Sequence, residues 1–173
     1  MSIKRFFITG SIFSILFILQ EAVINQVTLP AGGFSIFLIL TLIWAVLSPP
    51  VVAASVGFGA GILLDLSPST SGPIGHWTLI LVLLGYAISF LSFGNENMRS
   101  NPLSLVFMVT VAQLIALIAY LISGFLLGIT ATSFAQTITT LIGSSIWTLV
   151  ITPLFLPAAV WLHDLAFESR MRI

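Results

Sequence analysis

The chain has 173 residues, of which 58% are hydrophobic and only 6% are charged, and its mean hydropathy is +1.20. About a quarter of the residues in a soluble domain are charged, so this composition excludes a water-soluble fold. The zero net charge excludes a basic nucleic-acid-binding protein, and the lack of cysteine excludes disulfides and thiolate metal sites. Unbroken apolar runs, rather than alternating ones, predict a helical integral membrane protein.

Six apolar runs follow one another and predict an all-α bundle of six transmembrane helices, in a single domain of residues 1–173. A span needs about 20 apolar residues, and the breaks between these runs contain proline, glycine or polar residues. Pro153 and Pro157 interrupt the last run, where we expect a kink because proline lacks a backbone donor. The predicted spans are residues 6–24, 34–47, 51–64, 77–93, 102–127 and 134–161.

The second and third runs are each short for a span. As one helix they would measure about 46 Å, too long without strong tilt, whereas two helices form a hairpin that turns at Ser48-Pro49-Pro50. The basic residues favour two helices, because six spans with a cytoplasmic N-terminus place all of them in the cytoplasm, as the positive-inside rule requires. They are Lys4, Arg5, Arg99, Arg170 and Arg172. We therefore expect both termini to be cytoplasmic.

Ionisable residues near the predicted spans are few, and they do not form a catalytic set. Glu21, Asp65 and His76 all lie toward the outer face, and Asp164 lies in the tail on the opposite side, so no aspartate pair can share a proton. Ser144-Ser145 lie in the last span, away from His76, which argues against a serine nucleophile with a histidine base. Two histidines on opposite sides cannot hold a metal ion. We expect no enzyme activity and no cofactor.

A stripe of small residues ends in an aspartate in the third span. Gly57, Gly61 and Asp65 recur every four residues and share one helix face, where another helix backbone can approach closely. Asp65 can be partly hydrated there or can cap a neighbouring helix N-terminus. Pro68 and Gly72 indicate tight turns in the loop that follows. The stripe is thus either internal helix packing or a partner interface.

This region resembles one known family. The pattern G-x-x-x-G-x-x-x-D-L-x-P of residues 57–68, then Gly72, Gly75 and Gly85-Tyr86, resembles the rod-shape-determining protein MreD, with agreement in chain length and span number. The resemblance implies a non-catalytic subunit in the inner membrane that pairs with MreC. Such a subunit helps to connect cytoplasmic MreB filaments to the RodA glycosyltransferase and its partner transpeptidase. It also implies a helical arrangement similar to the substrate-binding subunits of energy-coupling-factor vitamin transporters.

The resemblance and the stripe together define the candidate interface. Its residues are Gly57, Gly61, Asp65, Pro68, Gly72 and Gly75. We expect Asp65 to contact a mostly periplasmic partner, because it lies at the outer surface, and Gly61 to pack inside the protein.

The alternative is a substrate-binding subunit of a vitamin importer, which should gather polar and aromatic side chains in its outer half. The predicted outer loops, residues 25–33 and 67–75, are short and hold few large polar groups. Gln20 and Glu21 either mark the end of the first span or line an outer cavity with Asp65, and Trp77 is an interfacial anchor or a core aromatic. We therefore expect neither a small-molecule substrate nor a nucleic-acid partner.

Overall fold

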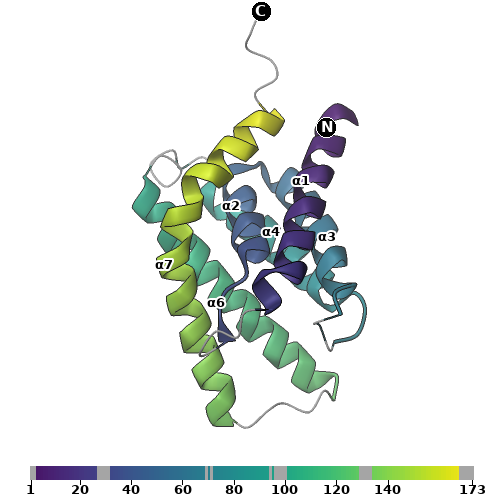
Figure 1. Ribbon diagram of the computed structural model, residues 1–173, viewed down its shortest axis with the longest axis vertical. Coiled ribbons are helices and arrows are strands. Elements are labelled where there is room, and N and C mark those ends of the chain that lie inside the picture. The colour runs from purple at the N-terminus through teal and green to yellow at the C-terminus, as the bar shows by residue number, and fades with distance from the viewer. Residues whose placement is uncertain are drawn as a thin grey trace, which may run out of the picture.

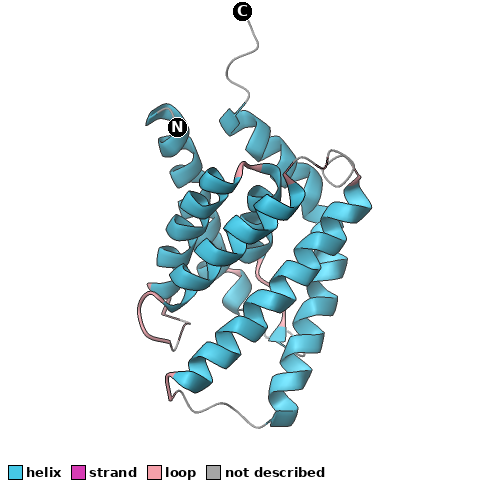
Figure 2. Cartoon of the chain, turned by 180° about the vertical axis from the view of Figure 1, so that it is seen from behind, coloured by secondary structure: helices cyan, strands magenta, loops and turns pink. Residues whose placement is uncertain are grey.

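The computed structural model describes residues 3–26, 32–68, 70, 72–93, 95, 101–128 and 134–167. In these residues the chain forms six α-helices, one short 3₁₀ helix and no strand, as Figures 1 and 2 show. All six predicted helices are confirmed, with ends that differ from the predicted ones by a few residues. The elements are α1 (Ile3–Ala22), η1 (Ile24–Gln26), α2 (Ile36–Leu47), α3 (Pro50–Asp65), α4 (His76–Ser92), α6 (Pro102–Leu126) and α7 (Phe134–Phe167).

Helix α2 is the core of the bundle. Every residue from Ile36 to Val46 is buried, and α2 packs against α1, α3, α4, α6 and α7. A helix that is apolar on all sides must be surrounded by other apolar groups, and here the neighbouring helices supply many of them. Phe13 of α1, for example, meets the rings of Phe37 and Trp44 edge to face at 5.8 and 5.4 Å. The core of the protein therefore forms around its shortest α-helix.

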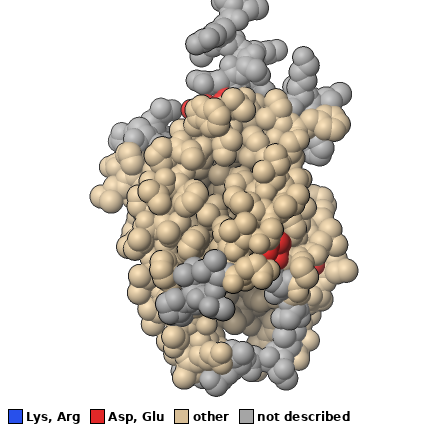
Figure 3. Space-filling view, in the orientation of Figure 1, with Lys and Arg blue, Asp and Glu red and all other residues tan. Residues whose placement is uncertain are grey.

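The α-helices fall into two length classes. Three segments are long and apolar enough to cross a membrane, namely Phe7–Gln26, Pro102–Leu126 and Ala135–Ala166. The apolar helices α2, α3 and α4 have 12, 16 and 17 residues, which corresponds to about 18 to 26 Å against a hydrocarbon core of about 30 Å. Figure 3 shows a face that is almost entirely uncharged over its described residues. The fold is that of a helical membrane bundle.

The α2–α3 hairpin turns where the sequence predicts it. Helix α2 ends at Leu47, Pro49 is the N-cap of α3 and Pro50 is its first residue. Prolines 49 and 50 have no N–H, so carbonyls in the last turn of α2 lose their usual helical donors. Ser92 Oγ of α4 replaces one of these donors and bonds to Val46 O at 3.0 Å, and Ser89 Oγ donates to the carbonyl of the C-cap residue Ser48 at 2.5 Å. All three helices are thereby joined at this turn.

Helix α7 continues through Pro153 and Pro157 without a break. Its upper part nevertheless leans away from the direction of its lower part (Figure 1), as expected for a helix containing prolines. At that end, His163 Nε2 lies 3.3 Å from Ser48 Oγ and the His163 ring packs edge to face on Trp44. The end of α7 is thus attached to the α2–α3 turn.

Helix α1 begins and helix α7 ends at the same end of the bundle (Figure 1). The loop between α3 and α4 lies at the opposite end. Arg99, Arg170 and Arg172, on which part of the predicted topology rests, lie outside the described residues.

Candidate functional site

The glycines of the stripe bring the backbones of α3 and α4 into direct contact. A Cβ atom added to Gly57 would lie 2.4 Å from Leu81 O, and one added to Gly61 would lie 2.3 Å from Thr78 Cα. Gly85 makes the reciprocal approach from α4, where a Cβ would lie 3.1 Å from Ala53 O. Both α3 glycines are buried. Of the two alternatives for this face, the geometry supports internal helix packing.

The carboxylate of Asp65 caps α4 from the end of α3. It accepts hydrogen bonds from the backbone N–H groups of Gly75 at 2.9 Å, Trp77 at 2.8 Å and Thr78 at 3.1 Å, and from Thr78 Oγ1 at 2.5 Å. The N-cap of α4, Gly75, has no side chain and a φ of 97°, so Asp65 supplies the acceptor that a capping residue normally provides. A negative charge at this position also complements the helix dipole.

Asp65 is therefore an internal residue. Only 9% of its surface is exposed, and its carboxylate points into the α3–α4 hairpin. The possibility that it caps a neighbouring helix is the one realised here. The expectation that it faces a partner finds no support in this geometry, because its oxygens already bond to four donors of α4 and the loop.

The loop between α3 and α4 holds the remaining residues of the candidate interface. Pro68 and Gly75 are exposed. Gly72 is partly buried, and a Cβ there would lie 2.9 Å from Tyr120 Oη. Ser67 is buried and donates to Glu21 Oε1 at 2.5 Å, which ties the loop to the end of α1. Of the six residues of the candidate interface, only Pro68 and Gly75 are exposed.

The polar residues at the end of α1 form hydrogen bonds within the bundle. Gln20 is buried, donates to Asn25 Oδ1 at 2.8 Å and accepts from the N–H of Phe37 at 3.4 Å, in the first turn of α2. Glu21 accepts from Ser67. Of the two predictions for this pair, the end of the first span fits better than an outer cavity shared with Asp65.

Three aromatic rings stack beside the capped end of α4. The ring centroid of Tyr120, on α6, lies 4.3 Å from that of His76 and 4.6 Å from that of Trp77. His76 Nε2 is also within hydrogen-bond reach of Ser123 Oγ, one turn along α6 from Tyr120. Sequence patterns do not single out Tyr120 or Ser123. Their spacing of three residues indicates a shared helix face, but nothing in the sequence pairs that face with His76.

The structure brings a different serine, Ser123 of α6, within reach of His76. Ser123 Oγ also lies 2.5 Å from Ala119 O, a backbone acceptor in its own helix. His76 Nδ1 has no hydrogen-bond partner among the described residues.

Comparisons with protein families, curated proteins and solved structures found no match for this chain. Within the described ranges, His, Asp and Glu side chains form no group of three or more that could hold a metal ion.

A pocket of about 330 Å³ opens beside the aromatic stack, between α4, α6 and α7. Figure 3 shows the surface hollowed at the corresponding end of the molecule. Trp77 and Tyr120 line the pocket with three hydroxyl side chains, Thr70, Thr137 and Thr140. The short outer loops predict few polar groups at this end of the protein. In the structure, α7 contributes hydroxyl groups to the pocket as well as the loop, and sequence spacing alone does not reveal this.

Proposed function

We propose that this protein is a non-catalytic scaffold subunit of the bacterial cell-elongation complex, similar to MreD. It would pair with an MreC-like membrane protein and help to link MreB filaments to the RodA glycosyltransferase and its partner transpeptidase. One observation carries the proposal: the residues on which the resemblance rests form a single structural unit. Gly57, Gly61 and Gly85 join α3 to α4 backbone to backbone, and Asp65 caps α4.

In this proposal all six α-helices cross the inner membrane, with both termini in the cytoplasm. The three long helices span the bilayer, and the three shorter ones are enclosed or flanked by them. The common end at which α1 begins and α7 ends supports an even number of crossings. The lysine and arginine near the N-terminus, Lys4 and Arg5, support a cytoplasmic location for that end.

Co-purification tests the proposal. The tagged chain is expressed with the MreC-like protein of the same organism, and both are extracted in a mild detergent. We expect the two to elute together in size-exclusion chromatography and to stay together in dilute detergent. An unrelated single-span protein at the same expression level is the control. Elution of the MreC-like protein apart from this chain, as for the control, would contradict the proposal.

The pocket beside Tyr120 favours a second candidate function, the substrate-binding subunit of a small-molecule importer. A mostly apolar cavity with a few polar groups and aromatic rings is typical of ligand sites, and Trp77, Tyr120 and the threonines supply them. Mass spectrometry of the protein purified from native membranes distinguishes the candidates. A stoichiometric small molecule that is lost in Tyr120→Ala supports the importer. Its absence from both proteins, together with binding of the MreC-like protein, supports the scaffold.

A further inference from the structure

The pocket between α4, α6 and α7 has no charged side chain in its wall. It has a volume of about 330 Å³ and lies where α6 and α7 diverge toward the end of the bundle that holds the α3–α4 loop (Figures 1 and 2). The carboxylates at this end do not line it, because Asp65 bonds to four donors of α4 and the loop and Glu21 accepts from Ser67. A charged ligand would give up its hydration and meet no counter-ion. The wall therefore favours an uncharged ligand.

Thr140 gives the pocket a hydrogen-bond acceptor that a ligand can reach. It lines the pocket and is exposed. Its hydroxyl donates to Gln136 O at 3.0 Å, one turn earlier in α7. A hydroxyl group has one proton and two acceptor lone pairs, so the oxygen of Thr140 is left as an acceptor. A ligand in contact with this oxygen gains a hydrogen bond by donating an N–H or O–H group.

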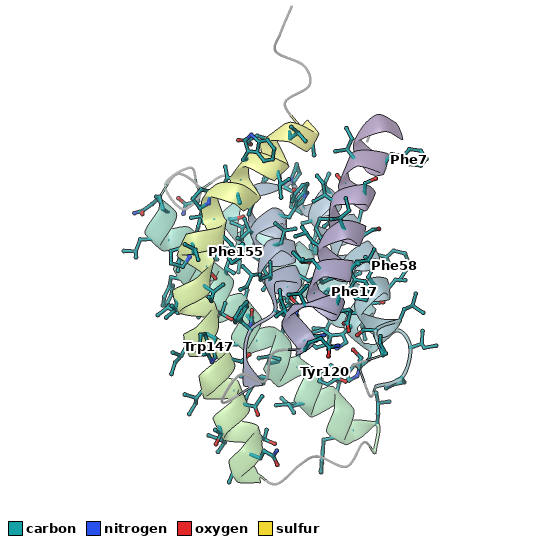
Figure 4. The ribbon with its side chains drawn as sticks, viewed as in Figure 1. Phe7, Phe17, Phe58, Tyr120, Trp147 and Phe155 are labelled. Atoms are coloured by element: carbon teal, nitrogen blue, oxygen red, sulfur yellow. The ribbon has the colours of Figure 1, made fainter. Side chains whose placement is uncertain are left out.

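The rest of the wall is mostly apolar and includes a fixed stack of rings. Leucines of α6 and α7 line the pocket beside Trp77 and Tyr120 (labelled in Figure 4). The Tyr120 ring is stacked on the rings of His76 and Trp77, with centroid separations of 4.3 and 4.6 Å. A preformed, mostly apolar cavity with a few polar groups is typical of small-molecule sites. A cavity of about 150 Å³ accommodates a benzene ring, so this one has room for a molecule of about two rings.

We propose that the pocket binds an uncharged molecule of about two rings that donates an N–H or O–H group to Thr140. The inference names the ligand class for the second candidate function, and it rests on that function for its role in the cell. A phosphate-bearing lipid headgroup is charged, and a lipid acyl chain has no donor, so neither meets both requirements. An indole or a naphthol meets both.

Four indoles test the effects of charge and of the donor separately. Indole is uncharged and has an N–H, 1-methylindole is uncharged and has none, indole-3-acetate is an anion and tryptamine is a cation. The purified chain in lipid nanodiscs is dialysed to equilibrium against each, and empty nanodiscs give the uptake by lipid alone. We expect saturable binding of one indole per chain, about tenfold weaker binding of 1-methylindole, and no uptake of the charged indoles above that of empty nanodiscs. Indole uptake no greater than that of empty nanodiscs, or a charged indole bound as tightly as indole, would overturn the proposal.

Two neighbouring threonines locate the binding. Thr140→Val keeps the shape of the side chain and removes the acceptor, so it should bind indole about tenfold more weakly and 1-methylindole as the unaltered chain does. Thr139→Val is the matched control, because Thr139 is exposed, donates to Ala135 O at 2.9 Å in the same way and does not line the pocket. It should bind both molecules normally. Equal affinities of the two variants for indole would overturn the proposal.

These measurements use the chain without a partner, so their outcome is separate from that of the proposed function. Indole binding by a chain that carries no small molecule when purified from native membranes would count against the importer function and support the ligand class. Indole uptake equal to that of empty nanodiscs, with co-purification of the MreC-like protein intact, would overturn this inference and leave the scaffold function standing.

Discussion

Asp65 determines how the α3–α4 hairpin closes, because one carboxylate satisfies three backbone N–H groups and one hydroxyl. These hydrogen bonds account for an aspartate at this position without a partner protein. A side-chain oxygen at a helix N-terminus stabilises the helix, and hydrogen bonds to a charged group are stronger than neutral ones. The first effect of changing Asp65 should therefore appear in the stability of the protein.

Asp65→Asn should lower the free energy of unfolding by about 2 kcal/mol, because the amide keeps one acceptor oxygen and loses both the second one and the charge. Thermal unfolding in detergent measures the loss, and abundance in the membrane should fall with it. Asp164→Asn, at a half-exposed position beside His163, is the control and should change neither. Normal abundance and melting of Asp65→Asn, with loss of the MreC-like partner, would instead show that the carboxylate faces the partner.

Gly59 and Gly61 lie on one helix, two residues apart, and should respond oppositely to the same change. Gly61→Ala should destabilise the protein by about 1–3 kcal/mol, since its Cβ would overlap the backbone of α4. Gly59→Ala meets nothing within 4 Å, so it should stabilise α3 by up to about 1 kcal/mol through the higher helix propensity of alanine. Melting temperatures of the two variants in one detergent test this. Equal shifts in the same direction would be incompatible with the described packing.

At the scale of residues, the four-residue spacing of Gly57, Gly61 and Asp65 predicts a shared face, and the structure has that face. The same spacing does not reveal what the face meets. Thr78, the closest contact of Gly61 and a donor to Asp65, lies beyond a loop whose path local patterns do not determine. Nor does the sequence show that a Cβ atom on Gly10 or Gly59 would meet nothing within 4 Å.

At the scale of elements, the α2–α3–α4 unit depends on a hydroxyl group that compensates for a proline. The carbonyl of Val46 would bond to the N–H of residue 50 in a continuing helix, but that residue is proline. Ser92 supplies the donor from α4. The prolines predict the turn, whereas the role of a serine 46 residues further along the chain follows only from the packing of α4 against α2.

Ser92→Ala should lower the free energy of unfolding by about 1–3 kcal/mol, because it leaves a buried carbonyl without this donor. Ser55→Ala is the matched control: its exposed hydroxyl donates to Val51 O in the preceding turn of the same helix, so its loss should change stability little. Denaturation in detergent, followed by tryptophan fluorescence, compares them. Equal stability of Ser92→Ala and Ser55→Ala would mean that the hairpin does not depend on this bond.

At the scale of the whole molecule, composition and apolar runs predict an all-helical membrane bundle and the order of its helices. They do not predict that α2 is its centre. A short apolar run looks the same whether lipid or protein covers it, and α2 is distinguished only by contacts from five other helices. The pocket between α4, α6 and α7 is hidden in the sequence for the same reason, because its walls come from distant segments.

The topology makes its own prediction. Cysteines introduced at Ser2, Ser100 and Ser169 should resist a membrane-impermeant thiol reagent in intact cells, because six crossings place all three in the cytoplasm. Ile74→Cys, in the exposed part of the α3–α4 loop, should react and serves as the positive control. Labelling of Ser100→Cys from outside would rule out the six-span arrangement.

Membership of the cell-elongation complex is tested most directly in the bacterium that carries this chain. The protein is depleted from growing cells, and cell width and the insertion of new peptidoglycan along the side wall are followed by fluorescence microscopy. We expect the cells to widen and become round as side-wall insertion stops. The unaltered chain should restore the rod shape, and so should Ala87→Leu, a substitution at an exposed position of α4. Cells that remain rods of constant width, with side-wall insertion at its normal rate after the protein is gone, would contradict the proposed function.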